Sequence, residues 1–487
     1  MTAILPILLL LTSLVPAAIN FFLREDRYRL RNALNLGGAV LKVALIVAML
    51  LAVAGGASYE TSIPLAPGLV LLLRIDALAL LFVSLSAVLW LLTTIYAIAY
   101  LGTKPQQSRF FGFFSLCVFA TTGIALSGSL ISFFIFFELL TLSTWPLVAH
   151  KQDKASLTAA RSYLLYALPC STLLLLAIVW LESATGPVLF TEPPDLSGLD
   201  PASQRAIFAL FIAGVGMKAA IVPLHGWLPS AMAAPAPVSA LLHAVAVVKA
   251  GAFGVIRVVY DVFGVSRVAE LGVGTPLAIL ASVTILWGSV QALRQSEIKK
   301  RLAYSTVSQV SYIVLGAALA SPFAVIGGLA HLVHQGLMKI TLFFCAGIYD
   351  ERAGVRAVAG LDGLGRLMPW TSACFSLGAL GMIGLPPLAG FVTKVYLGVG
   401  ALQAGAPWVL AVLGVSTLLN AAYFLPLLYR LWFRDPAPDA RGDERAPALV
   451  VPAVIAALAA LGAGGLAASA VSPLGWASLI AEREYLR

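Results

Sequence analysis

The chain has 487 residues, of which 60% are hydrophobic and 11% are charged, and its formal net charge is +9. Soluble domains carry roughly 25% charged residues, so this composition excludes an ordinary soluble protein. Apolar runs of about 20 residues recur along the whole chain, and each is long enough to cross a bilayer core as a helix. Composition therefore predicts an integral membrane protein without a soluble domain.

Span length and hydropathy predict an all-α membrane fold with about fourteen transmembrane helices. The first run is followed at once by the charged segment REDRYRLRN and has no small-residue cleavage pattern, so we expect a retained helix rather than a signal peptide. We expect residues 1–487 to form a single polytopic domain. In chain order the predicted spans are 2–22, 35–54, 76–100, 111–128, 129–149, 160–182, 206–227, 235–262, 272–293, 303–320, 322–348, 370–397, 406–432 and 446–472.

Charged loops predict the orientation of these spans. The basic segments REDRYRLRN, TKPQQSR, HKQDKAS and RQSEIKKR all fall on one side of the membrane, and the acidic TEPPDLSGLD falls on the other. Because basic loops remain cytoplasmic, we expect a multi-pass protein of the inner (plasma) membrane with both termini on the outer side. The positive net charge then reflects topology, and no nucleic-acid partner is expected.

The cysteines and the known phosphate-binding motifs point away from cofactor chemistry. Neither a CxxC motif nor a Cys/His cluster is present to bind zinc, haem or an iron–sulfur cluster, and buried structural thiols are expected. A GxxxxGK[ST] loop is also missing from the sequence, so ATP-driven pumping is not expected. We expect no cofactor, no metal and no catalytic chemistry in the chain itself. The cysteines lie singly within predicted spans, at Cys117, Cys170, Cys345 and Cys374.

We single out five of the ionisable residues inside the predicted spans: Glu138, Lys218, Lys249, Lys339 and Lys394. One charge at a helix centre costs about 2.5 to 3.5 kcal/mol, so five unpaired charges would cost on the order of 12 to 18 kcal/mol. Snorkelling to the headgroups is the ordinary explanation for a lysine near a helix end. Glu138 and Lys249 lie near mid-span, where buried ion pairing or a hydrated pathway explains them better.

Histidines accompany these charges. His225, His243, His331 and His334 fall within or beside the same spans, whereas His150 lies in a basic loop. A single intramembrane histidine is most often a hydrogen-bonded packing residue, but its side chain titrates near neutral pH and can relay protons. Four histidines beside buried lysines favour a relay.

Prolines predict two broken helices. Pro223 lacks a backbone N–H and should interrupt the helix that carries Lys218, and Pro386 with Pro387 should interrupt a helix just before Lys394. The freed carbonyls are tolerated at membrane depth only against protein or a water-filled cavity. We therefore expect each break to lie beside a buried lysine in a polar setting.

The two breaks share the pattern Pro-Leu-x-Gly-aromatic, as PLHGW at 223–227 and PLAGF at 387–391. Transporters often place interrupted helices at corresponding positions of inverted repeats. The sequence thus predicts two inverted five-helix repeats. They span 111–262 and 272–432, with flanking helices in 1–100 and 446–472.

Four motifs over residues 75–432 resemble one family. FFELLTLSTW, MKAAIVPLHGWLPSAMAAPAPVSALLHAVAVVKAG, EIKKRLAYSTVSQ and GLPPLAGFVTK occur in this order. They are similar to motifs of the antiporter-like proton-translocating subunits of respiratory complex I, Mrp-type cation/proton antiporters and energy-converting hydrogenases. The resemblance implies a fourteen-helix core with two inverted repeats, and partner subunits within a membrane complex.

The resemblance also implies roles for particular residues. Glu138 resembles the glutamate on the family's fifth helix, and Lys218 resembles its partner lysine on the broken seventh helix. Lys249 resembles the central lysine of the eighth helix. Lys394 matches the lysine of the broken twelfth helix and would pass a proton to the outside or to a neighbouring subunit.

The chain departs from the family pattern on the eleventh helix. Many relatives have His-x-x-x-His-x-x-x-Lys there, whereas this chain has His331, Gln335 and Lys339, with His334 one place earlier. Glutamine cannot titrate, so a relay through Gln335 itself is not expected. His334 would relay the proton instead, from a different face of the helix.

Three subunit types fit the resemblance: the D subunit of Mrp-type antiporters, its hydrogenase-linked equivalent and a shorter complex I paralogue. The length is unlike that of the longest complex I paralogue and fits all three types. The segment APAPVSALLHAVAVVKAGAF is closer to the hydrogenase-linked and general versions than to the D subunit, and among the three we favour the Mrp type. The transported ions are protons, exchanged for Na⁺ or K⁺ in the antiporters. Two other readings remain open: a stand-alone solute carrier built on broken helices, and a structural scaffold whose buried charges fix helix register.

Overall fold

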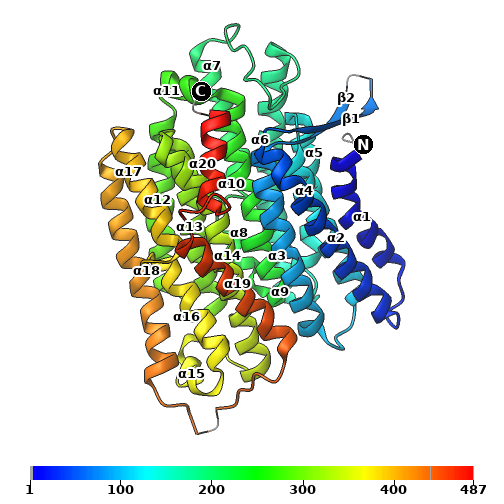
Figure 1. The fold of residues 1–487 in the computed structure, drawn as a ribbon, viewed down its shortest axis with the longest axis vertical. Coiled ribbons are helices and arrows are strands. Elements are labelled where there is room, and N and C mark those ends of the chain that lie inside the picture. Colours follow the sequence, from blue (N-terminus) through cyan, green and yellow to red (C-terminus); the bar gives the residue numbers. More distant parts are fainter. Residues whose placement is uncertain (1–3, 68, 439, 486–487) are drawn as a thin grey trace.

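The computed structural model describes residues 4–67, 69–438 and 440–485. Figure 1 shows an elongated bundle in which most helices run along the long axis. Twelve of the described helical segments are long and apolar enough to cross a membrane, which confirms the helical membrane fold. They are α1 (Leu5–Phe22), α2 (Tyr28–Ala54), α3 (Ala77–Leu101), α4 (Gln107–Leu126), α5 (Leu130–Val148), α6 (Lys154–Thr185), Ala236–Phe263, α12 (Gly274–Leu293), α13 (Ile298–Leu319), α14 (Pro322–Ala353), α18 (Trp408–Phe433) and α19 (Pro447–Gly465).

Two further predicted spans are interrupted, as the sequence predicts. Residues 217–226 separate α7 (Pro201–Gly216) from α8 (Trp227–Ser230), and residues 384–388 separate α16 (Pro369–Ile383) from α17 (Ala389–Gln403). Each of the fourteen predicted ranges overlaps one of these helices, although the number of membrane crossings stays a prediction. Residues 2 and 3 of the first predicted range lie outside the described residues.

The segment Ala236–Phe263 consists of four parts. It begins with α9 (Ala236–Ala240) and the π-helical η3 (Leu241–Val245), and it continues as α10 (Val247–Arg257) and the π-helical η4 (Val258–Phe263). The remaining short elements lie outside the long helices. They are η2 (Ala231–Ala233), α11 (Val265–Leu271), η5 (Val358–Leu361), α15 (Leu364–Leu367), α20 (Pro473–Ile480) and η6 (Ala481–Tyr485).

Side-chain caps explain where several helices begin. The first amides of a helix have no partner within the helix, and a short polar side chain can accept from one of them. Asp76 accepts from Ala79 N at 2.7 Å at the start of α3, and Asp153 accepts from Ser156 N at 2.7 Å at the start of α6. Asp200 caps α7 in the same way.

An antiparallel hairpin follows α2, and the sequence analysis does not predict it. β1 (Tyr59–Ala66) pairs with β2 (Leu69–Ile75), with Tyr59 opposite Ile75 and Ile63 opposite Leu71. Its strands hold apolar residues without the length of a span, so a search for membrane helices passes over them. In Figure 1 the hairpin lies at the same end of the molecule as the two chain ends.

The 32-residue α14 forms the centre of the bundle, and its most apolar stretch is entirely buried. It packs against α13, α16, α17 and α19. The connection from α18 to α19 and the short α15 lie at the opposite end of the molecule from the hairpin (Figure 1). All four cysteines are buried and free, as expected.

Candidate functional site

The first break surrounds Lys218. Helix α7 ends at Gly216, and its last α-type hydrogen bond joins Ala219 N to Val215 O at 3.2 Å. Ala220 then takes a left-handed backbone, with φ 56°. The chain therefore leaves the helix three residues before Pro223, which lies exposed at the surface, whereas Lys218 is buried.

Protein groups satisfy much of the backbone freed by this break. Trp227 donates its indole N–H to Met217 O at 2.8 Å, and Val222 N donates to Thr284 Oγ1 at 3.1 Å. The sequence analysis expects the freed carbonyls to face protein or a water-filled cavity. Here an indole of the next helix faces the Met217 carbonyl, because the chain folds back on itself between the two residues.

Glu138 and Lys218 are neighbours within electrostatic range, but no direct ion pair joins them among the described residues. The Lys218 ammonium donates to Phe137 O and lies 3.3 Å from the centroid of the Phe137 ring. Glu138 instead accepts a hydrogen bond from Ser171 of α6 and is half-buried. The predicted pair is thus open in this structure, because the lysine is held by the residue next to the glutamate.

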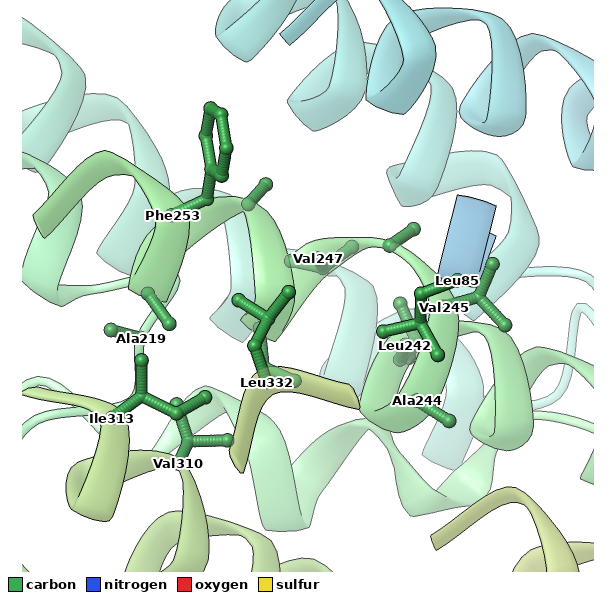
Figure 2. Close-up of a cluster of buried hydrophobic side chains, with 14 of the residues drawn as sticks. Leu85, Ala219, Leu242, Ala244, Val245, Val247, Phe253, Val310, Ile313 and Leu332 are labelled. Carbon is green, nitrogen blue, oxygen red and sulfur yellow. The ribbon is translucent and has the colours of Figure 1, made fainter. Parts of the chain in front are cut away.

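Lys249 lies on α10 at the middle of the bundle and is fully buried. Its Nζ has no hydrogen-bonding partner among the described residues. Figure 2 shows the apolar packing around its helix, with Val247 and Phe253 of α10, Ala219 of the first break and Leu332 of α14. The amine is therefore a buried polar group without a hydrogen-bonding partner in the described part of the chain, and apolar side chains cover part of its helix.

Gly251 brings the helix of Lys249 against the first break. A Cβ at this position would lie 2.1 Å from Ala219 N and 2.4 Å from Lys218 C, so only glycine permits the contact. Helix α10 therefore packs backbone to backbone on the residues around Lys218. The helix that carries Lys249 is therefore in direct contact with the segment that carries Lys218.

Helix α14 carries three of the predicted residues and Gln335, and all four are buried. Neither ring nitrogen of His331 has a hydrogen-bonding partner in the described part of the chain, and its ring centroid lies 5.3 Å from that of Tyr312. His334 Nδ1 bonds Thr393 Oγ1 of α17 at 2.9 Å, and the amide of Gln335 is unpartnered there. Lys339 donates to Ser305 and to Leu302 O, the latter at 3.1 Å.

The second break holds Lys394, one turn into α17. Its Nζ donates to Ile383 O at 2.6 Å and to Thr417 Oγ1 at 2.8 Å. The Tyr312 ring lies 5.8 Å away. Gly384, with φ 90°, leaves space for the lysine side chain, because a Cβ there would meet Lys394 Cδ at 2.9 Å.

These residues form one buried line in which neighbours lie within electrostatic range of one another. His331 lies within electrostatic range of Lys249, His334 and Lys394, and Lys339 lies within range of Lys249. His243, whose ring nitrogens are both unpartnered among the described residues, is within range of Lys339. The line thus connects η3, α10, α14 and the second break.

Two histidines lie apart from this line. His225 is half-buried at the first break, where its Nε2 accepts from Trp287 Nε1 at 3.2 Å. His150 lies beyond the end of α5 with its ring 5.1 Å from that of Phe110. His225 is therefore placed at the edge of the bundle, and His150 is outside the site, as its loop position predicts.

The sequence analysis overlooks several charges that are buried or half-buried in the described part of the chain. Lys42 of α2 is completely buried within the predicted span 35–54, so the rule that identifies the other intramembrane lysines applies to it as well. Lys299, assigned to a basic loop, donates to Ala234 O at 2.6 Å. Arg257 pairs with Asp76 at 3.1 Å and with Asp261 at 2.9 Å, and the spacing of Arg257 and Asp261 on one helix could have indicated that pair.

Comparison with known proteins assigns the family. A family model described as NADH:quinone oxidoreductase/Mrp antiporter, TM, matches residues 127–420, which include both breaks and every lysine of the line. NADH-quinone oxidoreductase subunit N of Desulforudis audaxviator is 38% identical over 387 residues, which make up 77% of this chain and 75% of that protein.

Two other curated relatives are longer than this chain. Hydrogenase-4 component B of Escherichia coli is 30% identical over 398 residues, which make up 77% of this chain and 59% of that protein. The putative antiporter subunit mnhA2 of Staphylococcus aureus is 33% identical over 343 residues, 66% of this chain and 42% of that protein. The chain therefore spans less than two thirds of the length of both.

Solved structures share the fold over nearly the whole chain. A chain of the Mrp complex from Dietzia sp. has a TM-score of 0.86 at 24% identity, and the match covers 99% of this chain and 97% of that one. A chain of respiratory complex I from Thermus thermophilus has a TM-score of 0.76 at 22% identity, with 96% and 98% covered. With the family model and the 38% identical relative, the conclusion is plain: the chain belongs to the NADH:quinone oxidoreductase/Mrp antiporter transmembrane family.

Proposed function

We propose that this chain moves protons along the buried line of lysines and histidines, as one membrane subunit of a larger complex. One observation carries the proposal: Lys249, His243 and His331 are fully or almost fully buried, and none has a hydrogen-bonding partner in the described chain. Buried polar atoms without protein partners are rare and costly, and water in a polar cavity commonly satisfies them. A hydrated line of titratable groups can transfer protons, whereas a structural scaffold has no need of one.

The Glu138–Lys218 site would control this line. When Glu138 approaches Lys218, its negative charge offsets the ammonium, and Lys249 holds its proton more readily. When the pair is open, as here, the uncompensated ammonium disfavours a second positive charge nearby. The backbone contact at Gly251 supports such coupling, because it keeps the two lysine sites in adjoining elements.

Access from the end with the basic loops is supported by a polar cavity of about 250 Å³, lined in part by Glu297, Lys299 and Asp350. Lys299 lies within electrostatic range of buried His243. A proton taken up there would next meet His243 and Lys339. The exit would follow Lys394, whose side chain is half-buried at the second break.

We further propose two inverted five-helix repeats, 111–262 and 272–432, in a plasma-membrane protein with both termini outside. Two features support this arrangement: a 32-residue helix, α6 or α14, stands third in each range, and an interrupted helix stands fourth. The two chain ends lie at one end of the molecule in Figure 1, away from the connections with basic residues. Flanking helices in 1–100 and 446–472 would complete the domain.

The partners are proposed to be other membrane subunits. Relatives and fold neighbours named for an antiporter, a hydrogenase and an NADH-quinone oxidoreductase support two energy sources. In an Mrp-type complex, protons would exchange for Na⁺ or K⁺. In a redox complex, electron transfer in another subunit would drive the pumping, and the 38% identity to a subunit N favours that second candidate.

Replacing Lys249 tests the proposed function. Lys249→Ala should reduce proton flux about a hundredfold or more, since a relay group is worth about 10² to 10⁴ in rate. Proton flux is measured in vesicles that contain the intact complex, and co-purification of the other subunits verifies assembly. Lys154→Ala, at an exposed lysine outside the line, is the matched control and should retain wild-type flux. Wild-type flux in an assembled Lys249→Ala complex contradicts the proposal.

A further inference from the structure

Lys42 lies in a polar site formed by two hydroxyl side chains, outside the line described above. Its side chain is completely buried, and its Nζ donates to Ser13 Oγ of α1 at 3.0 Å and to Thr122 Oγ1 of α4 at 2.7 Å. The Trp90 ring of α3 lies 5.1 Å from the nitrogen. No described carboxylate pairs with Lys42, and α1, α3 and α4 bring only these two hydroxyls and the indole ring to it.

The hydroxyl protons fix the direction of these bonds. Ser13 donates its own proton to Leu10 O at 3.3 Å, and Thr122 donates to Val118 O at 2.8 Å. Each hydroxyl therefore offers only lone pairs to Lys42, and the lysine must donate to both. An ammonium directs its third N–H and its charge toward the indole face, whereas a neutral amine keeps both hydrogen bonds. The site thus accommodates both protonation states without rearrangement.

The proposed relay lysines have the same kind of surroundings. Lys394 donates to a carbonyl and a threonine hydroxyl beside a tyrosine ring, and Lys218 donates to a carbonyl beside a phenylalanine ring. The buried Arg257 differs, because two carboxylates surround it. Lys42 therefore resembles the lysines that can lose a proton rather than the cation that is held as a fixed charge.

Helix α4 connects Lys42 with the first break. Thr122 contacts Lys42, and Cys117, five residues earlier and so about 7.5 Å along the helix, lies within electrostatic range of Lys218. Cys117 also contacts Ser143 Oγ of α5 at 3.3 Å. Between them Thr121 donates to Cys117 O at 2.8 Å. One buried helix thus carries polar contacts to both lysine sites.

We propose that Lys42 is a further proton-binding site of this chain, coupled to the Lys218 site through helix α4. The inference rests on the proposed function, because it assigns Lys42 to the same proton transport. It extends the transport machinery into the flanking helices α1–α3, outside the two repeats, with Thr122 on α4 at the start of the first repeat. A fixed structural cation and a packing side chain are the competing roles, and each makes a different prediction for substitution.

Two substitutions of Lys42 separate these roles. Lys42→Met removes the titrating group at similar length, and Lys42→Arg keeps a permanent charge. A proton-binding site requires both variants to lose about tenfold or more of the proton flux in assembled complexes. Wild-type flux in Lys42→Arg would mean that only a fixed charge is needed, and wild-type flux in Lys42→Met would mean that only volume is needed. Either result overturns the inference. Lys154→Met is the matched control and should behave as wild type.

Thr122→Val provides a test that leaves Lys42 in place. Valine has the shape of threonine but cannot accept the lysine N–H, so the protonated form loses a charge-assisted hydrogen bond. The pH dependence of flux should shift to lower pH by about one unit. An unchanged pH profile overturns the inference, even where the Lys42 variants fail to assemble. These tests distinguish the two hypotheses. If the proposed function is wrong, Lys249→Ala will pump normally; if only the inference about Lys42 is wrong, Lys249→Ala will lose proton flux while a variant of Lys42 or Thr122 behaves as wild type.

Discussion

The two broken helices share a sequence pattern but hold their lysines differently. At the second break Lys394 donates to Ile383 O, the last residue of α16. At the first break Lys218 donates instead to Phe137 O of the neighbouring α5, and the Trp227 indole bonds the Met217 carbonyl at the end of α7. A cation caps one half-helix, and a neutral indole caps the other.

This difference gives the two breaks different responses to protonation of their lysines, although they share a sequence pattern. A positive charge at the carboxyl end of a helix is favourable, because it interacts with the partial negative charge of the free carbonyls. Protonation of Lys394 therefore strengthens the second break itself. Protonation of Lys218 acts on α5 and Glu138, while the first break keeps its structure. At the first break, the charge of Lys218 thus interacts with the carboxylate of Glu138 on a neighbouring helix. At the second break, the charge of Lys394 stabilises the end of α16 itself.

Removing each lysine should give the largest effects. Lys394→Met and Lys218→Met should each lower proton flux about a hundredfold, since both remove a titrating group. Only Lys394→Met should also destabilise the protein, because it leaves Ile383 O without its donor at a cost of about 1 to 3 kcal/mol. Proton flux in vesicles and thermal unfolding of the purified complex measure the two effects separately.

Equal thermal stability of the two methionine variants would remove the distinction between the breaks. The Phe137 carbonyl lies inside α5, so loss of Lys218 leaves it with its helical amide partner. Lys154→Met, at an exposed position, gives the baseline for both measurements.

Trp227→Phe should lower the stability of the protein but have little effect on proton flux. Phenylalanine fills most of the space of the buried indole but cannot donate to Met217 O. Because Ala220 N still donates to this carbonyl at 3.0 Å, stability should fall by only about 0.5 to 1.5 kcal/mol. Flux per assembled complex should stay within about threefold of wild type, since no titrating group is lost. Thermal unfolding is compared with that of Trp180→Phe, whose indole is exposed on α6. A Trp227→Phe complex that is fully stable but unable to pump would contradict the neutral-cap role.

The breaks also show how far sequence reasoning reaches. Pro16, Pro146, Pro169, Pro426 and Pro452 all lie inside intact helices. Pro223 and the Pro386–Pro387 pair differ from these in having a nearby lysine and a following glycine. The breaks were predicted from the prolines themselves, which alone do not distinguish the two groups. The point at which α7 ends was not predictable, because it depends on Ala220 and on the indole of Trp227, a later residue.

The site was predictable as a set of residues but not as a set of contacts. The cost of burying a charge identifies Lys249 and Lys394 from sequence alone. The orientation of Glu138 toward Ser171, rather than toward Lys218, depends on the packing of α5 against α6. Lys42 had the same signal as the other lysines, and it was passed over because it lies outside the motifs.

The smallest predicted effect concerns the amino-terminal ends of α7 and α16, the first halves of the two broken helices. Helix α7 starts at its own cap, Asp200, which accepts from Ala202 N at 2.9 Å and from Ser203 N at 3.1 Å, whereas Glu444 from a distant connection bonds the first amides of α16. The bonds from Ser203 hold the pKa of Asp200 below its ordinary value. A carboxyl whose pKa is lowered in the folded state adds stability above its unfolded pKa and loses it as pH falls through the folded value.

The cap of α7 should therefore weaken below the ordinary pKa of aspartate, roughly pH 4. Asp200→Asn keeps a side-chain oxygen that accepts at every pH, so it serves as the pH-independent reference. Hydrogen exchange of the Ala202 and Ser203 amides is compared between the two proteins at each pH, which cancels the intrinsic pH dependence of exchange. At pH 7 the wild type should be protected at least as well as the variant, because a charged carboxylate also interacts with the amino end of the helix. At pH 3 this advantage should be reduced. If the wild type keeps its full advantage at pH 3, the carboxylate charge is not what holds the start of α7.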